Sequence, residues 1–409
     1  MKVQNLNGRY LMILRKYIIG VRFALANIVL ISNAFVWYYL AFYILKELIK
    51  ELFLSGWAIH FFGAIFSAIL GAILSEKIHK RTTFLAFWMI FGIISSLVLI
   101  IVKSTSMIDV LAISFLFGSS FGLGVPASLG YFTDSIAIEN RGKLGGVIFC
   151  VNSIGGFLIL LMVTNDIVLQ ALSLAIWRAL GLIVFYIVKP SPEIDSRKST
   201  SFKSILSQRP FILYYVPWIM FSLVNYLSLP VQFNILGSDT VNLLITVETL
   251  LAGVFAIFGG ILSDTIGRKR MIVFGFIILG LGYAILGIYP ENMLCWYFYT
   301  FADGLAWGIF YVIFIFTLWG DLSQNVSSEK YYALGGLPFF ISNFLRIIIG
   351  SYIAQTVSFY AIFSFVAFFL FLAVVPLMFA PETLPEKKLR ERELRQYVEK
   401  AKKIKEKYI

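Results

Sequence analysis

The chain has 409 residues, of which 59% are hydrophobic and only 14% are charged. Soluble domains contain about 45–50% apolar and about 25% charged residues, so this composition excludes a soluble globular protein. The net charge of +12 would suggest nucleic acid as the partner of a soluble protein. Here the basic residues gather in alternate loops between apolar runs, which is typical of a membrane protein, and we expect no nucleic-acid binding.

Apolar runs of about 20 residues, long enough for a helix to cross a bilayer, repeat along the whole chain. We therefore predict an all-α integral membrane protein with about twelve spans. The predicted spans are 22–45, 52–75, 83–102, 108–132, 144–163, 167–188, 211–236, 240–263, 271–289, 293–319, 333–353 and 357–379. An even number of spans with basic loops on the side of the termini predicts cytoplasmic N and C termini. The first run lacks a small-residue cleavage site, so we treat it as a span and not as a signal peptide.

Few residues suit metal binding or catalysis. The only cysteines are Cys150 and Cys295, and the only histidines are His60 and His79. This set predicts neither a disulfide framework nor a metal centre. The sequence also lacks a nucleotide-binding loop of the Gly-x4-Gly-Lys-Ser/Thr type and a set of catalytic residues that would meet at one interface. We expect no cofactor and no enzymatic activity.

A short pattern occurs twice, about half a chain apart, and each copy lies between two apolar runs. The copies are AILSEKIHKR, residues 72–81, and GILSDTIGRK, residues 260–269. In each copy an acidic residue, Glu76 or Asp264, precedes a basic cluster. Further matches at a steady offset of about 190 residues are Asn33 with Asn225, Asp134 with Asp321, and Gly145-Gly146 with Gly335-Gly336. This internal symmetry predicts two similar bundles of six helices each, an arrangement common in transporters.

The longest polar stretch between spans divides the chain. Pro190 and Pro192 end the sixth apolar run, and the serines and charges that follow them favour a loose linker. The predicted parts are an N-terminal bundle, 1–188, a cytoplasmic linker, 189–210, a C-terminal bundle, 211–379, and a cytoplasmic tail, 380–409. The apolar residues of the tail fall on one helix face, which predicts an amphipathic helix on the membrane surface or on the bundle. A solvated helix without such a role is the alternative.

These motifs resemble the major facilitator superfamily of membrane transporters. The second copy carries the family's loop signature almost completely, as Gly260-x-Leu262-Ser263-Asp264-x-x-Gly267-Arg268-Lys269-Arg270. The first copy departs from it, with Ala72 for glycine, Glu76 for aspartate and His79 for the second glycine. Two segments, Asp134 to Arg141-Gly142 and Pro381-Glu382-Thr383, are similar to elements of sugar and organic-solute porters, although the first lacks the usual proline. The resemblance covers about residues 10–385.

The resemblance implies that the two loops hold the cytoplasmic side closed in an outward-facing state. A carboxylate at the membrane boundary can accept hydrogen bonds from the free N–H groups of a helix start, or pair with a basic residue. The alternative is that the loop charges only anchor the loops at the cytoplasmic surface. The gating candidates are Asp264, Arg268, Glu76, Lys80, Arg81, Asp134, Arg141 and Asp321.

Ionisable side chains inside a membrane are costly and are therefore functional candidates. The candidates for proton coupling are Asp303, Glu248, Arg346 and His60. Arg346 can pair with one of the acids or bind an anionic substrate, and His60 can instead be a hydrogen-bonded packing residue. We expect Arg178, on a supporting helix, to have a structural role.

The resemblance implies that spans 1, 4, 7 and 10 line a central cavity. Polar and aromatic residues on or near these spans are the candidates for substrate binding: Asn33, Trp37, Tyr38, Asn225, Tyr226, Gln232, Tyr299 and Trp307. Amides and phenols suit a sugar or polyol better than a bare anion. The alternative is that the amides bridge helices within the bundle. Pro230 is expected to kink the seventh span.

We expect a monomeric secondary transporter, or permease, of the plasma membrane. It would import a small polar organic solute, a sugar or related metabolite, by proton symport and alternating access. The alternative is a proton-driven exporter of amphipathic compounds, and Na⁺ remains an alternative coupling ion. The expected partners are the small-molecule substrate, protons and membrane lipids.

Overall fold

The computed structural model describes residues 2–49, 53–78, 80–102, 106–161, 166–188, 198–324, 326–384 and 394. Over these residues the chain is helical, and the only β-type pairing is a single bridge between Lys198 and Val326. Eleven of the described helical segments are long and apolar enough to cross a membrane. The all-α, multi-pass prediction is therefore confirmed.

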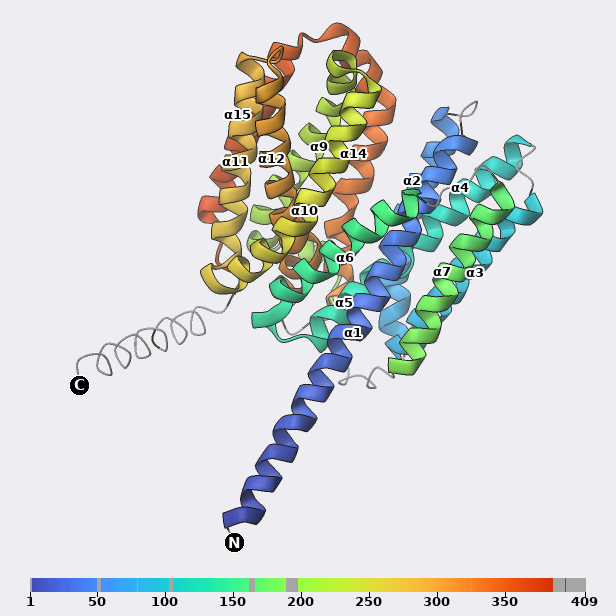
Figure 1. Cartoon of the computed structure of the whole chain (residues 1–409), viewed down its shortest axis with the longest axis vertical. Helices are drawn as coiled ribbons and strands as arrows, with labels where there is room; N and C mark the ends of the chain where they lie inside the picture. The colour runs from blue at the N-terminus through green and yellow to red at the C-terminus, as the bar shows by residue number, and fades with distance from the viewer. Residues whose placement is uncertain are drawn as a thin grey trace.

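The first group of helices forms one side of the molecule (Figure 1). Its elements are α1 (Lys2–Leu48), α2 (Phe53–Lys77), α3 (Arg81–Val102), α4 (Met107–Gly122), α5 (Val125–Ser135), η1 (Ile138–Asn140), α6 (Arg141–Leu161) and α7 (Ile167–Val188). Helix α1 begins well before the predicted first span and projects from the body of the molecule (Figure 1). Helix α6 packs on α1 within this group and on α10 of the other group.

The second group begins after the predicted linker. Its elements are α8 (Phe202–Leu206), α9 (Arg209–Leu236), α10 (Ser238–Ile266), α11 (Arg268–Ile288), α12 (Met293–Phe310), η2 (Tyr311–Thr317), α13 (Leu318–Ser323), α14 (Glu329–Thr356) and α15 (Phe359–Phe379). The division into two bundles at 189–210 stays a prediction, because residues 189–197 lie outside the described part of the chain. The predicted amphipathic tail also lies outside it, except for residues 380–384 and Leu394.

Two of the predicted spans are interrupted at matching places in the two groups. The fourth span is divided into α4 and α5, and Pro126 occupies one of the first positions of α5. The tenth span passes from α12 into a π-helical segment, η2, and then into α13. The backbone N–H of Leu318 donates to the carbonyl of Ile313, five residues earlier, which is the π-helical pattern. The sequence analysis predicts each of these spans as one continuous helix, so it misses both interruptions.

Close approach between helices depends on glycine at a few positions. A Cβ atom on Gly118 of α4 would lie 2.1 Å from the carbonyl oxygen of His60 on α2. A Cβ atom on Gly260 of α10 would lie 2.1 Å from the carbonyl oxygen of Gly142 on α6, which belongs to the other group. Both contacts exclude any larger residue without a shift of the backbone.

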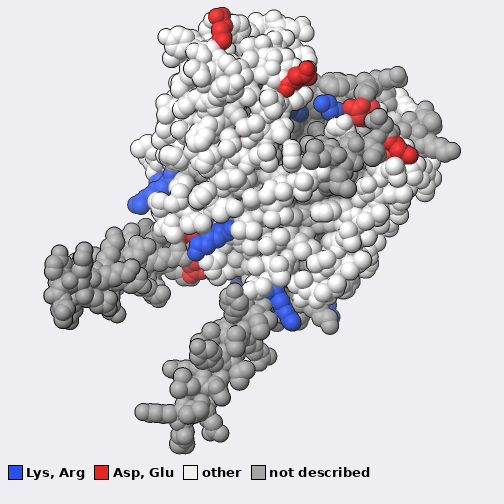
Figure 2. Space-filling model, viewed as in Figure 1, with Lys and Arg blue, Asp and Glu red and all other residues white. Residues whose placement is uncertain are grey.

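Large apolar side chains cover much of the surface, as expected for helices that face lipid. Examples are Phe87 at 64%, Ile187 at 70% and Phe368 at 61% exposure. Figure 2 shows the charged side chains of the described residues near the ends of the helices, with a broad uncharged region between them. In water such a surface would be unfavourable, whereas in a bilayer it is the expected one.

Candidate functional site

A layer of ion pairs lies at one end of the molecule, which we call the basic end. It lies where α2 leads to α3 and α10 leads to α11. Asp264, at the end of α10, is fully buried. Its carboxylate accepts hydrogen bonds from the backbone N–H groups of Gly142 at 3.0 Å and Lys143 at 2.8 Å. Asp264 therefore caps the first turn of α6, where a negative charge is favoured by the helix dipole.

Two arginines and one aspartate extend this layer. The guanidinium of Arg268 pairs with Asp264 at 2.5 Å and with Asp321 at 3.1 Å. Asp321 also pairs with Arg141, at 2.6 Å, so it joins α13 to the first residue of α6. Arg268 donates a further hydrogen bond to the carbonyl of Ile138. The buried charges therefore balance one another across the two groups of helices.

The first copy of the repeated pattern makes equivalent contacts. Glu76, at the end of α2, pairs with Lys330 in the first turn of α14 at 2.6 Å. Arg81 pairs with Asp134 of its own group at 2.8 Å and with Glu329 of the other group at 2.5 Å. In both copies, an acidic residue of the loop binds the start of a helix in the other group of helices.

Some residues of this layer were not among the predicted site residues. Glu329 and Lys330 occupy the position of Arg141-Gly142 in the internal repeat, and this was the signal that could have identified them. Lys80, a predicted gating residue, is exposed and makes no ion pair within the described residues. His79, the third departure from the family signature, lies outside the described part of the chain.

The Pro-Glu-Thr segment after the last span also contacts this layer. The carboxylate of Glu382 accepts hydrogen bonds from the backbone N–H groups of Arg268 at 2.9 Å and Lys269 at 3.1 Å. It thereby caps the start of α11. Gly267 precedes this helix with a φ of 118°, a conformation that glycine adopts far more readily than other residues.

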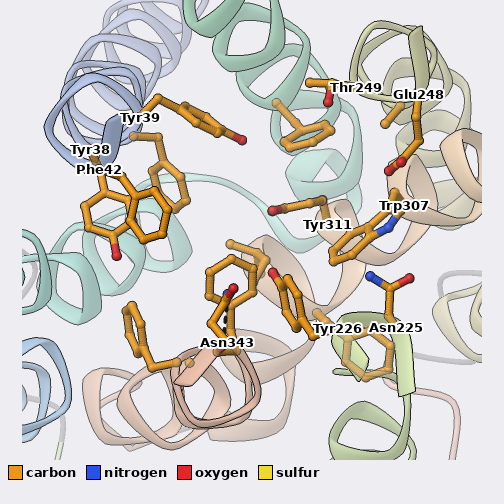
Figure 3. Close-up of a pocket in the computed structure, with 18 of the residues that line it drawn as sticks. Tyr38, Tyr39, Phe42, Asn225, Tyr226, Glu248, Thr249, Trp307, Tyr311 and Asn343 are labelled. Carbon is orange, nitrogen blue, oxygen red and sulfur yellow. Dashed lines mark hydrogen bonds between the residues drawn. The ribbon is translucent and has the colours of Figure 1, made fainter. Parts of the chain in front are cut away.

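A central cavity of about 450 Å³ lies between the two groups of helices. Its wall is mainly aromatic, and Figure 3 shows Tyr39 and Tyr311 extending into it. The predicted substrate residues that line it are Tyr38, Asn225, Tyr226, Gln232, Tyr299 and Trp307. Thr249 and Asn343 add polar groups that we did not predict (Figure 3). The volume and the aromatic wall are typical of sites for small organic molecules.

Two predicted substrate residues lie elsewhere. Asn33 donates to the carbonyl of Trp177 at 2.6 Å and accepts from the guanidinium of Arg178 at 3.1 Å. The indole of Trp37 donates to Ser96 at 2.9 Å and is fully buried. Neither residue lines the cavity, because both lie on the face of α1 that packs against the helices of its own group. The prediction for these two residues is therefore corrected.

Arg178 is held in the interior of the first group without an acidic partner among the described residues. Its guanidinium lies 4.6 Å from the ring centroid of Trp88 and 5.3 Å from that of Trp37. The aromatic faces attract the cation and, with Asn33, replace the acidic partner that a buried arginine usually has. Its surroundings are those of a structural residue.

Two carboxyl groups line the cavity. The Asp303 carboxyl is buried on α12 and accepts a hydrogen bond from the Tyr299 hydroxyl at 2.7 Å. The Tyr299 hydroxyl in turn accepts from the amide of Gln232 at 3.1 Å and lies 3.0 Å from the Tyr283 hydroxyl. The other carboxylate oxygen of Asp303, Oδ1, has no hydrogen-bond partner within the described residues.

Glu248 on α10 is the second of these acids, and its carboxyl group points toward Trp307 (Figure 3). It lies on α10, which packs against α12, the helix that carries Asp303. Neither acid forms an ion pair with a described residue, in contrast to the acids at the basic end. A protonated carboxyl group avoids the cost of an unpaired charge in such surroundings.

Arg346 on α14 lines the same cavity. Its guanidinium lies 5.5 Å from the ring centroid of Tyr226. The expected alternative of an ion pair with Glu248 or Asp303 is not what the structure shows, because no carboxylate of the described residues lies within 4.0 Å of it.

His60 reaches the cavity only through Tyr38. Its Nδ1 lies 3.2 Å from the carbonyl oxygen of Ser114, and its Nε2 lies 2.9 Å from the Tyr38 hydroxyl. A carbonyl oxygen can only accept, so Nδ1 carries the hydrogen, and in the neutral ring Nε2 accepts from Tyr38. The ring is buried and fixed in orientation, and Tyr38 is the cavity residue that it supports.

Comparison with known proteins agrees with this arrangement. The second half of the chain, residues 211–407, matches the sequence model of the Major Facilitator Superfamily. The sequence of this half resembles that superfamily, and the fold of the described chain is that of solved membrane transporters.

Solved structures of membrane transporters are similar in fold over most of the chain. The human organic anion transporter MFSD10 is similar with a TM-score of 0.68 and 14% identity, over 88% of this chain and 99% of that one. The Escherichia coli fucose:proton symporter FucP is similar with a TM-score of 0.67 and 10% identity, over 87% and 98%. A bacterial homologue of the iron transporter ferroportin, in an outward-facing state, has a TM-score of 0.68 and 12% identity, over 88% and 98%. At these identities the likeness concerns the fold, and no curated protein sequence matches the chain.

Proposed function

We propose that this transporter moves a small polar organic solute across the plasma membrane together with protons. The observation that carries this proposal is the pair of carboxyl groups, Asp303 and Glu248, in the central aromatic cavity without a basic partner among the described residues. Such groups bind protons when the cavity is open to one side and release them when it is open to the other. Because the acids line the cavity itself, protonation and solute binding can influence each other directly.

The ion pairs at the basic end support alternating access as the mechanism. With the basic loops on the cytoplasmic side, these pairs close the cytoplasmic end of the cavity. Figure 1 shows the ribbons of the two groups diverging toward the opposite end. To open the cytoplasmic end, the links of Glu76 with Lys330, Arg81 with Glu329, and Arg141 with Asp321 must break. Their formation and loss bias the equilibrium between the two states.

Sugars and related metabolites are the first neutral solutes to test. Asn225, Gln232 and Asn343 bring amide groups to the cavity, and such groups can hydrogen-bond hydroxyls. The similarity in fold to a fucose:proton symporter supports the same choice.

The aromatic wall favours a second candidate function, proton-driven export of amphipathic compounds. Tyr39, Phe42, Phe121, Phe339 and Phe340 give the cavity a large apolar surface. Export requires proton and solute to move in opposite directions, whereas import by symport moves both together.

The test uses the purified full-length protein in weakly buffered detergent solution. Sugars, organic acids, amino acids and hydrophobic cations are added while the pH is recorded, and binding is measured in parallel. A solute that binds should cause proton uptake in the wild type, and Asp303→Asn or Glu248→Gln should abolish the uptake. The control is Asp239→Asn, an exposed acid at the start of the same helix as Glu248, which should leave proton uptake unchanged. A solute that binds without any proton signal would contradict proton coupling.

A further inference from the structure

Some charged side chains in the described part of this protein form ion pairs with an opposite charge, and others do not. At the basic end Arg81, Arg141, Arg268 and Lys330 each lie within 2.5–2.8 Å of a carboxylate oxygen. Arg346 lines the central cavity and has neither an ion pair nor a hydrogen bond within the described residues. Its charge is therefore left to be balanced by something that enters the cavity.

The contact with Tyr226 satisfies only part of what Arg346 requires. The ring face attracts the cation over 5.5 Å, but it accepts no hydrogen bond in the plane of the guanidinium. A guanidinium carries five N–H donors in a planar fork. This fork fits the two oxygens of a carboxylate, and the pair is stronger than a hydrogen bond between neutral groups.

The acids of the cavity do not fill this role. Glu248 and Asp303 lie on α10 and α12, whereas Arg346 lies on α14, and no ion pair joins them. If both acids carry protons, the cavity with Arg346 alone has an excess positive charge. One anionic solute group at Arg346 would make the loaded cavity neutral, which lowers the cost of exposing it to a low-dielectric surrounding.

The other residues of the cavity wall indicate the size and chemical character of the rest of the solute. Tyr226 and Asn343 lie beside one another near Arg346 on the wall, and Tyr39, Tyr311 and Trp307 face the space between (Figure 3). A volume of about 450 Å³ leaves room for a ring or chain attached to an acidic group. Aromatic side chains contact an apolar or aromatic body favourably.

We propose that the transported solute is an organic carboxylate with an aromatic or apolar body, and that Arg346 binds its carboxylate. This inference deepens the proposed function and rests on the assignment of the central cavity as the transport site. It replaces a neutral sugar by an anion as the preferred substrate class. Arg346 is then the residue that determines specificity for charge.

The experiment compares solutes that differ only in charge. Binding of phenylacetate and phenylacetamide, and of glucuronate and glucose, is measured by calorimetry on the purified full-length wild type. We expect phenylacetate to bind roughly tenfold to hundredfold more tightly than phenylacetamide, because only the acid forms a charge-assisted pair. Equal affinities for phenylacetate and phenylacetamide would overturn the proposal. Tighter binding of glucuronate than of phenylacetate would overturn the assignment of an apolar body.

Variants locate the effect at Arg346. Arg346→Gln should lose roughly tenfold or more in affinity for phenylacetate, and Arg346→Lys should lose less, because it keeps the charge but not the fork. The matched control is Arg270→Gln, which removes an exposed arginine at the basic end and should leave binding unchanged. If Arg346→Gln does not fold, the affinity of Arg346→Lys for phenylacetate and the comparison of phenylacetate with phenylacetamide on the wild type still test the proposal. Unchanged binding of phenylacetate by Arg346→Gln would contradict the assignment.

The proton signal separates this inference from the proposed function. If phenylacetate binds through Arg346 but causes no proton uptake, the result supports the proposed substrate class and contradicts proton coupling. If neutral solutes bind and cause proton uptake while carboxylates do not bind, proton coupling stands and the role of Arg346 is overturned.

Discussion

At the scale of single residues, a similar set of acidic and basic side chains serves two purposes. At the basic end the partner of each charge is another residue of the chain, as with Asp321 between Arg141 and Arg268. In the cavity, Asp303 and Arg346 have no charged partner among the described residues. In the proposed mechanism, the first arrangement stabilises one state of the protein, and the second leaves charges for protons and solute.

The ion pair between Glu76 and Lys330 gives a test at this scale. Either Glu76→Gln or Lys330→Met leaves one side chain, about 10% exposed, without its charged partner. Each should weaken the closed state by roughly 1–3 kcal/mol. The readout is the labelling rate of Ser328→Cys, a buried residue at the start of α14, in a protein whose Cys150 and Cys295 are replaced by serine.

The double variant decides whether the pair acts as a unit. Each single variant should raise the labelling rate by roughly tenfold, and the double variant should label about as fast as either single variant. Rates that multiply in the double variant would show that Glu76 and Lys330 act independently.

The sequence predicted part of this residue-level arrangement. The repeat identified Asp264 and Glu76, because the same pattern recurred at matching positions. Their partners are in the other half, so no local pattern could predict the contacts with Gly142 and Lys330. Asn33 was assigned to the cavity because it is polar, but its amide binds Arg178 in the interior. Polarity alone does not show which face of a helix a side chain occupies.

At the scale of elements, the positions of the spans were predictable and their interruptions were not. Runs of apolar residues determine where helices cross a membrane. The π-helix Tyr311–Thr317 contains no proline or glycine that would have indicated it. Within it, Tyr311 stacks on Phe149 with ring centroids 4.1 Å apart, and Phe314 stacks on Trp218 at 4.7 Å. Packing of these rings between several helices accompanies the change in helical pattern, and it depends on the whole fold.

The contact between α2 and α4 gives a test at the element scale. Gly118→Ala would place a methyl group 2.1 Å from the carbonyl oxygen of His60, so the helices must separate. Overpacking of this kind costs about 1–3 kcal/mol. We expect a lower apparent Tm than for the wild type. Gly20→Ala is the control, because a Cβ atom there meets nothing within 4 Å, and its Tm should not fall. Equal Tm values for the two variants would contradict the close helix packing.

At the scale of the whole molecule, the proposed mechanism combines three features. In it, the central cavity binds the solute, the unpaired acids in its wall bind protons, and the ion pairs at the basic end hold one side closed. The repeat and the composition predicted the membrane fold and two related halves. They could not predict the substrate class, which depends on which charges remain unpaired after folding.

The most direct measurement of the central claim is solute accumulation by vesicles containing the purified protein. With an acidic exterior, wild-type vesicles should accumulate a labelled carboxylate above its external concentration, and a protonophore should abolish the accumulation. Vesicles with Asp303→Asn should bind or exchange the solute but not accumulate it, whereas those with Asp239→Asn should behave as the wild type. Accumulation that survives the protonophore, or that Asp303→Asn leaves intact, would contradict proton-coupled transport through this cavity.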